Sequence, residues 1–154
     1  MEKRFLERGG LWAVVQWGLM GGALVSAPIF PDHWPDTGSL PAALALLAAG
    51  SFFGIWGTLL LGRNRTIYPE PKPGSRLVTH GIYAWVRHPL YTSVILLLLA
   101  WALAWQSLPA LVLAVATAAF LDAKSRHEEK RLRQQFPGYQ DYARRVKRLV
   151  PFLY

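Results

Sequence analysis

Long uncharged stretches alternate with short basic ones along this chain. Gly9 to Phe30 runs for 22 residues without a charged side chain, and Leu40 to Gly62 runs for 23. A helix of that length is about 30 Å long, which matches the hydrocarbon core of a bilayer. We therefore predict membrane spans at about residues 10–30 and 40–62. The glycines of the second stretch are interpreted first as sites of close helix packing and second as cofactor contacts.

The first stretch has an alternative interpretation as a signal peptide. Basic residues precede it, and Val25-Ser26-Ala27 resembles a small-residue cleavage site. Its length and the presence of Trp12, Gln16 and Trp17 favour a retained span.

The second half of the chain predicts a helical hairpin over residues 89–121. Pro89 suits the first turn of a helix at 89–106, and a second arm follows at 108–122. Both arms are short for full spans, so the hairpin is tilted or its second arm continues into water. We expect the second option, an amphipathic cytoplasmic helix, because Asp122 to Gln135 contains no helix breaker and Pro137-Gly138 then supplies a stop.

The distribution of basic residues predicts the topology. Of the 17 lysines and arginines, three precede the first span, five lie in 63–88 and nine follow the last span. The two opposite loops have none, so four spans with both termini cytoplasmic satisfy the positive-inside rule. The predicted fold is an all-α integral membrane protein with four transmembrane helices, one domain over 1–154, in the cytoplasmic (inner) membrane.

Composition removes several classes of function. The net charge is +8, but 53% of the residues are hydrophobic and occur in long blocks, which argues for attraction to anionic lipid and against nucleic-acid binding. The chain has no cysteine, and its four histidines lack close paired spacing, so we predict no metal site. Phosphate-loop and serine-hydrolase motifs are missing from the sequence.

Two polar clusters carry the candidate chemistry. One is Thr79 to Tyr91, just before the hairpin, and the other follows Leu121, just after it. A hairpin returns its second arm beside its first, so Arg87, His88 and Tyr91 are expected within reach of the segment after Leu121. Binding of lipid phosphate by Arg87 and an aromatic belt at the interface remain simpler interpretations.

Glu128 is the acidic residue that we single out in the second cluster. On a helix it shares a stripe with Leu121, Ser125 and Leu132, where a carboxylate needs a donor. Arg87 is an obvious partner for Glu128, and a ligand amine or a ribose hydroxyl is an equally obvious one.

Glu129 lies on a different stripe of the same helix. Asp122, Arg126, Glu129 and Arg133 follow one another at i, i+4, i+7 and i+11. For Glu129 and Arg133 we weigh ordinary surface salt bridges evenly with a functional role.

An R-H-P-x-Y element before the hairpin and an E-E-x-x-L-x-x-x-F element after it form a specific pair. These and the residues around them are Gly81 to Tyr91, Glu128, Glu129, Leu132, Phe136, Gly138, Tyr139, Tyr142 and Val150-Pro151. From about Leu61 to its end, the chain resembles the isoprenylcysteine carboxyl methyltransferase family and its phospholipid methyltransferase relatives. It departs from the family pattern at Ile82, Ala84 and Ser93.

The resemblance implies that S-adenosylmethionine is held by two cytoplasmic elements, 63–91 and 122–154, while an apolar passage between helices admits the acceptor. The implied cofactor-binding residues are His80, Gly81, Tyr83, Arg87, His88, Tyr91, Glu128 and Glu129. The implied catalytic residues are Arg87, Glu128 and Arg133.

The expected reaction is methylation of a lipophilic or membrane-embedded acceptor, with carboxylate O-methylation of an isoprenylcysteine-like substrate placed first. A carboxylate acceptor needs no general base, because it is ionised at neutral pH. Phospholipid amine N-methylation and thiol S-methylation are the alternatives within enzymes. A membrane scaffold or lipid-binding protein is the non-enzymatic alternative. The expected partners are the bilayer and the acceptor; the oligomeric state stays open.

Overall fold

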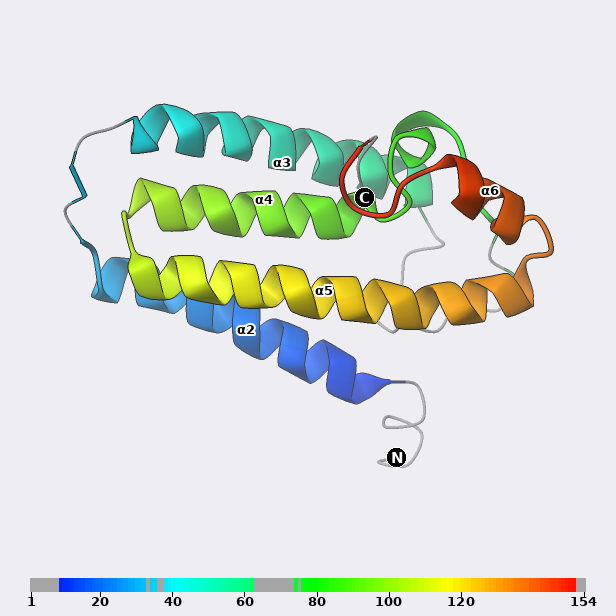
Figure 1. The fold of residues 1–154 in the computed structure, drawn as a ribbon, viewed down its shortest axis with the longest axis horizontal. Coiled ribbons are helices and arrows are strands. Elements are labelled where there is room, and N and C mark those ends of the chain that lie inside the picture. Colours follow the sequence, from blue (N-terminus) through cyan, green and yellow to red (C-terminus); the bar gives the residue numbers. More distant parts are fainter. Residues whose placement is uncertain (1–8, 33, 36–37, 63–73, 75, 152–154) are drawn as a thin grey trace.

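The described part of the chain is mainly helical. The computed structural model describes residues 9–32, 34–35, 38–62, 74 and 76–151, and these contain no β-strand beyond one isolated bridge. The elements are α2 (Gly10–Ile29), α3 (Ser39–Leu61), the 3₁₀ turn η2 (Gly81–Ala84), α4 (Pro89–Ala104), α5 (Leu108–Gln135) and α6 (Tyr139–Arg145) (Figure 1). The predicted all-α class is confirmed.

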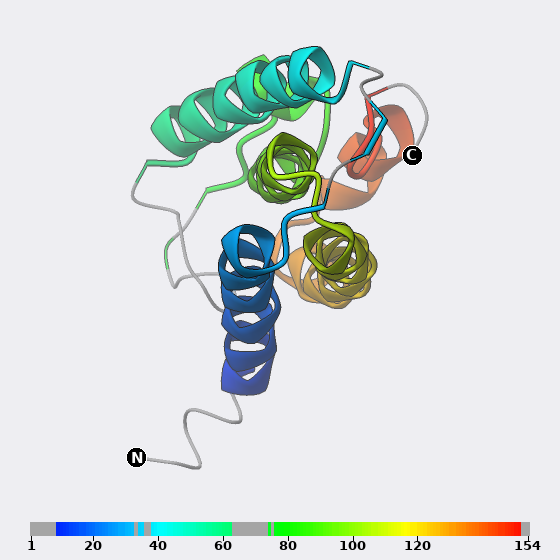
Figure 2. The ribbon, with the colours of Figure 1, turned by 90° about the vertical axis from the view of Figure 1, so that its left-hand side faces the viewer.

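Four long helices lie along one another, and the short elements gather at one end. Helix α4 packs against α3 and α5, and α2 packs mainly against α5 (Figures 1 and 2). Both η2 and α6 lie at the end where α4 begins and α5 finishes (Figure 1). The ends of elements distant in sequence therefore meet at this end of the bundle.

The hairpin after Pro89 is formed as expected. Helix α5 is one continuous helix of 28 residues, and the Ser107 hydroxyl caps its start by accepting from the Ala110 amide at 3.5 Å. It ends at Gln135, just before Pro137, which has no amide hydrogen to donate. The prediction that the second arm continues past Leu121 as a helix is confirmed.

Glycine and alanine set the close approach of the helices. A Cβ on Gly54 would lie 2.5 Å from the Ser93 hydroxyl oxygen, and one on Gly50 would lie 3.0 Å from Leu97. The Ser93 hydroxyl donates to the Gly50 carbonyl at 2.7 Å, so a side chain of α4 contacts the backbone of α3. These contacts support the helix-packing interpretation of Gly50 and Gly54.

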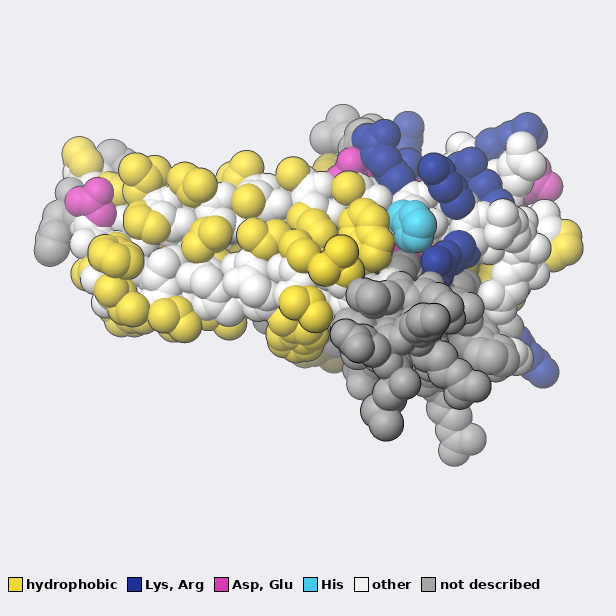
Figure 3. All heavy atoms as spheres, turned by 90° about the horizontal axis from the view of Figure 1, so that it is seen from below, with side chains coloured by type: hydrophobic (Ala, Val, Ile, Leu, Met, Phe, Trp, Pro, Cys, Tyr) yellow, Lys and Arg dark blue, Asp and Glu magenta, His cyan; other side chains and the backbone are white. Residues whose placement is uncertain are grey.

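Three helices are long and apolar enough to cross a bilayer, namely α2, α3 and α5, whereas α4 is a shorter apolar helix of 16 residues. Large apolar side chains point outward along them, among them Leu59 at 74% exposed and Ile55 at 64%. Figure 3 shows this apolar surface over most of one face, with lysines and arginines gathered at one end. The fourth span and the orientation of the termini remain predictions.

Part of the predicted cytoplasmic surface lies outside the described residues. This applies to residues 1–8 and 63–73, which carry six of the basic residues used for the topology, and to 152–154.

Candidate functional site

The R-H-P corner, Arg87-His88-Pro89, is held by hydrogen bonds to the C-terminal segment. The amide of Arg87 donates to the Lys147 carbonyl at 2.8 Å, and the amide of His88 donates to the Arg148 carbonyl at 3.1 Å. Farther along, the Thr92 hydroxyl donates to the Leu149 carbonyl at 2.7 Å. The corner before α4 is thus held by backbone contacts 57 to 60 positions away in the sequence.

The guanidinium of Arg87 binds groups inside the protein. Its Nε and Nη2 atoms each lie 2.9 Å from Oε1 of Glu129. Its Nη1 atom donates to the carbonyls of Ala143, at 2.9 Å, and Val146. The side chain is 8% exposed, so Arg87 ties α5 to the end of α6.

Glu129 is the centre of this cluster. Its side chain is 2% exposed, and Oε1 lies 3.3 Å from His88 Nε2 and 3.2 Å from Arg148 Nε, besides Arg87. Arg133 approaches Oε2 at 3.8 Å. Burial by itself raises the pKa of Glu129, but hydrogen bonds and charge from His88 and Arg87 outweigh it and lower the pKa to about 2.

Glu128 has a different environment from its neighbour. It accepts a hydrogen bond from the Tyr91 hydroxyl at 2.5 Å, and its Oε2 lies 3.7 Å from His88 Nδ1. Burial raises the pKa of Glu128 more than His88, Tyr91 and Lys124 lower it. The pKa values of the two adjacent carboxyls are therefore moved in opposite directions.

His88 lies between the two carboxylates. One ring nitrogen faces each glutamate, and the ring stacks on Tyr91 with a 5.4 Å centroid distance and a 4° interplanar angle. The predicted meeting of Arg87, His88 and Tyr91 with the segment after Leu121 is confirmed.

One prediction about this cluster is wrong: Arg87 pairs with Glu129 and not with Glu128. Two interpretations were weighed evenly for Glu129, and an ordinary surface salt bridge does not describe it, because its side chain is 2% exposed although Arg133 lies 3.8 Å away. Consecutive residues of a helix point about 100° apart, so one position decides which glutamate meets the arginine. The Glu129 face is covered by the C-terminal segment through Arg148, a contact that the helical stripe does not reveal. Arg133 stays largely outside, at 55% exposed.

Three predicted cofactor residues belong to the turn at η2. His80 is exposed. Gly81 has φ of 60°, and a Cβ there would lie 2.5 Å from Leu60 of α3. Tyr83 donates to the Gly57 carbonyl at 3.4 Å, and burial raises its pKa to about 12. The contacts of Gly81 and Tyr83 thus hold the turn against α3. The other five predicted cofactor residues lie close to one another.

The structure adds residues that the sequence did not indicate as part of the site. Arg148 bridges Glu129 and Asp122, at 3.2 and 3.1 Å. Lys124 is buried, and its Nζ donates to Gln16 at 2.7 Å. The only sequence signal for this pair was a polar residue inside an apolar stretch and a lysine one turn before Glu128.

Tyr139 and Tyr142 cover the cluster from α6. The Tyr142 hydroxyl donates to the Tyr83 carbonyl at 2.6 Å, which fixes η2 to α6. Tyr139 is 1% exposed, and burial raises the pKa of both phenols. These aromatic residues therefore shield the Arg87–Glu129 pair from water.

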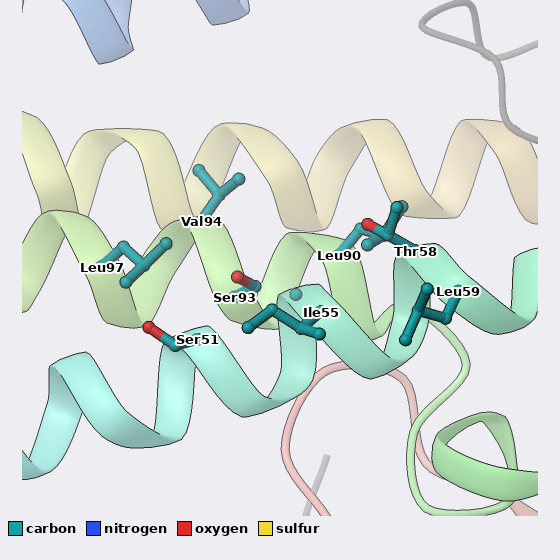
Figure 4. Close-up of a pocket in the computed structure, with 9 residues that line it drawn as sticks. Ser51, Ile55, Thr58, Leu59, Leu90, Ser93, Val94 and Leu97 are labelled. Carbon is teal, nitrogen blue, oxygen red and sulfur yellow. The ribbon is translucent and has the colours of Figure 1, made fainter.

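A groove of about 540 Å³ runs between α3 and α4 (Figure 4). Its lining is apolar apart from a few hydroxyls: Ser51, Gly54, Ile55, Thr58 and Leu59 of α3, and Leu90, Ser93, Val94 and Leu97 of α4. Leu90 lies in the first turn of α4, the turn that also carries Tyr91 of the polar cluster.

Chemically, the cluster combines acceptor oxygens, an imidazole, a phenol and an exposed arginine. Glu128 is the acidic member with 14% of its side chain still exposed, against 2% for Glu129. In the residues that the structure describes, there is no group of three or more His, Asp or Glu side chains arranged to hold a metal ion. The arrangement suits recognition of a ligand that carries amino or hydroxyl donors.

Comparison with known proteins gives the family. The family model for phospholipid methyltransferases matches residues 39–138, which include α3, the R-H-P corner, the hairpin and both glutamates. The chain is 30% identical over 148 residues to the "Nickel-cobalt-cadmium resistance protein NccN" of Alcaligenes xylosoxydans xylosoxydans, covering 96% of this chain and 66% of that protein. It is 31% identical over 148 residues to the "Cobalt-zinc-cadmium resistance protein CzcN" of Cupriavidus metallidurans, covering 96% and 65%.

The chain thus spans slightly less than two thirds of the length of these two relatives. The family match extends over the greater part of the sequence and contains the cluster around His88 and Glu129. The chain belongs to the phospholipid methyltransferase family, and this membership indicates a membrane methyltransferase.

Proposed function

We propose that the chain transfers a methyl group from S-adenosylmethionine to a lipophilic acceptor at the polar end of α4 and α5. The observation that carries the proposal is the meeting of His88, Tyr91, Glu128 and Glu129 within the part of the chain that matches the family. A scaffold or lipid-binding protein has no need of two carboxylates gathered around one imidazole.

The residues fit the polar part of the cofactor. Glu128 accepts from the amino group or a ribose hydroxyl, and Tyr91 and His88 offer a stacked aromatic face. Arg133, 55% exposed, is the arginine available to an anionic group, because the Arg87 guanidinium already holds Glu129 and two carbonyls. We therefore assign Arg87 the role of holding Glu129 in place. The cofactor supplies the electrophilic methyl group, and the chain aligns it.

The groove between α3 and α4 suits the apolar part of the acceptor. It reaches Leu90 in the first turn of α4, so an apolar chain along it ends at the same end of the bundle as the cluster. An isoprenylcysteine-like carboxylate stays our first choice of acceptor, since it needs no general base. A phospholipid amine or a thiol has to lose a proton, for which His88 is the candidate base.

Isothermal titration of the purified full chain with S-adenosylhomocysteine tests cofactor binding. Glu128→Gln is expected to weaken binding by about tenfold or more, since it replaces an ionised carboxylate acceptor for a charged donor with a neutral amide. Asp141→Asn is the matched control, because that carboxylate is 75% exposed and paired only at the surface with Arg144. Binding unchanged in Glu128→Gln, or no binding by the unmodified chain, contradicts the proposal.

Labelled methyl donor added to membranes that contain the chain identifies the acceptor. A base-labile methyl ester indicates a carboxylate, whereas stable label on a phospholipid headgroup or on a thioether indicates the amine or thiol alternative. Label absent from every product, with S-adenosylhomocysteine still bound, contradicts the transfer step.

A contribution to metal resistance is a second property that we propose for testing. It is suggested by the names of the two relatives, to which the chain is similar over 96% of its length. Expression of the chain in a cobalt-sensitive host, compared with its Glu128→Gln variant, links any resistance to the cluster. Equal resistance with both would separate this property from methyl transfer.

A further inference from the structure

Helix α2 makes one polar contact that reaches the neighbourhood of the site. Gln16 lies in the first half of this largely apolar helix, and its side-chain oxygen accepts from Lys124 Nζ at 2.7 Å. Lys124 is 2% exposed. A buried ammonium is costly unless it is paired or hydrogen-bonded, and α2 supplies one hydrogen-bond acceptor for it through Gln16. Helix α2 precedes the residues that match the family model, 39–138.

Lys124 is placed next to Tyr91 and Glu128. Its Nζ lies 5.4 Å from the centroid of the Tyr91 ring, and the Tyr91 hydroxyl donates to Glu128. Lys124 and Glu128 are also four residues apart on α5, so they share one face of that helix. Gln16, Lys124, Tyr91 and Glu128 therefore form one connected series from α2 to the site.

We propose that Gln16 and Lys124 are positioning residues: Gln16 fixes the Lys124 ammonium over Tyr91, where its charge keeps Glu128 ionised and able to accept from the ligand. What Glu128 then binds rests on the function proposed above. Neither Gln16 nor Lys124 is required to touch the cofactor.

The surroundings of Glu128 support this role. It is faced by Tyr91 of α4, by His88 at the start of α4, and by Lys124 and Glu129 of its own helix. Burial and Glu129 disfavour the ionised form, and His88, Tyr91 and Lys124 favour it. A role of Lys124 in helix packing alone would leave the ionisation of Glu128 unaffected.

Infrared titration of the full chain in lipid nanodiscs tests the proposal without cofactor. The band of the protonated Glu128 carboxyl is assigned by its loss in Glu128→Gln. Lys124→Met is expected to raise the midpoint of this band by about one pH unit, because a nearby opposite charge lowers a carboxyl pKa by about that much or more. Gln16→Leu is expected to raise it by a smaller amount, and Lys124→Arg to keep it near that of the unmodified chain.

Lys130→Met is the matched control, because Lys130 is an exposed lysine of the same helix. An unchanged midpoint in Lys124→Met, or an equal change in Lys130→Met, overturns the role of Lys124. An unchanged midpoint in Gln16→Leu overturns the role of α2. Titration with S-adenosylhomocysteine runs in parallel: failure of the unmodified chain to bind it contradicts the proposed function, while the infrared midpoints still decide on Gln16 and Lys124.

Discussion

Arg87 and Glu129 form the buried ion pair that fixes the geometry of the site. The pair joins the start of α4 to α5, and the same guanidinium holds two carbonyls at the end of α6. The sequence indicated Arg87, His88, Tyr91 and both glutamates, but it did not indicate Arg148 or Lys124, and it paired Arg87 with Glu128 in place of Glu129. Glu128 and Glu129 are the same residue type and differ only in the direction in which they point from the helix. The segment that packs over the helix decides which of the two is buried.

Removal of Arg87 is expected to destabilise the fold. Arg87→Ala leaves the Glu129 carboxylate buried without its main partner, which costs about 3–5 kcal/mol. Arg144→Ala is the control, since Arg144 is 72% exposed and its pair with Asp141 contributes about 0–1 kcal/mol. Thermal unfolding in detergent, followed by circular dichroism, measures both, and equal stability of the two variants would contradict the structural role of Arg87.

The pH dependence of stability reports on Glu129. Its pKa is lowered from 4.5 to about 2 in the folded chain, so its contribution is fully present above about pH 4.5. That contribution is lost as the pH falls from about 4.5 to about 2. Melting temperatures across this window should fall more steeply for the unmodified chain than for Glu129→Gln. Parallel curves would show that Glu129 is not held ionised by Arg87 and His88.

At the scale of elements, the hairpin and its extension followed from the sequence, because proline, serine and the apolar periodicity act within one or two turns. The contact between α3 and α4 is less local. Gly54 permits it, and the Ser93 hydroxyl completes it with a hydrogen bond to Gly50. Ser93 is one of the departures from the family pattern, and the structure gives it this packing role.

Gly54→Ala is expected to weaken the α3–α4 contact. The new Cβ would lie 2.5 Å from the Ser93 hydroxyl oxygen, and the resulting shift costs about 1–3 kcal/mol. Gly18→Ala is the control, because a Cβ there meets nothing within 4 Å and alanine favours a helix by about 1 kcal/mol. The midpoint of urea or thermal unfolding should fall for Gly54→Ala and rise for Gly18→Ala. Adding Ser93→Ala to Gly54→Ala should recover part of the lost stability. Destabilisation by both glycine variants alike would contradict this account.

At the scale of the whole molecule, an apolar body carries a charged end (Figure 3). Three helices meet the length and composition of membrane spans, and α4, with 16 residues, is shorter. Helix α4 is also flanked by α3 and α5, so its contacts are largely with protein. We keep the four-span topology with the polar end in the cytoplasm as a prediction.

Cysteine labelling tests this topology, since the chain has no cysteine of its own. Single cysteines are placed at exposed positions in Pro35→Cys, between α2 and α3, and in Gln140→Cys, in α6. A membrane-impermeant thiol reagent applied to intact cells should modify the first and reach the second only after lysis. The opposite labelling pattern would show that the orientation is inverted and that the cluster lies outside the cytoplasm.

The sequence by itself determined the helices, the hairpin and the polar corner that precedes it, because these depend on interactions between near neighbours. Tertiary structure alone decided that Glu129 is buried with Arg87, that Glu128 faces Tyr91, and that Gln16 of α2 reaches Lys124. It also assigned Gly81 and Tyr83 to the support of a turn. The physical reason is that burial of a charged side chain depends on which distant segment covers it, and periodicity within one helix holds no information about that segment.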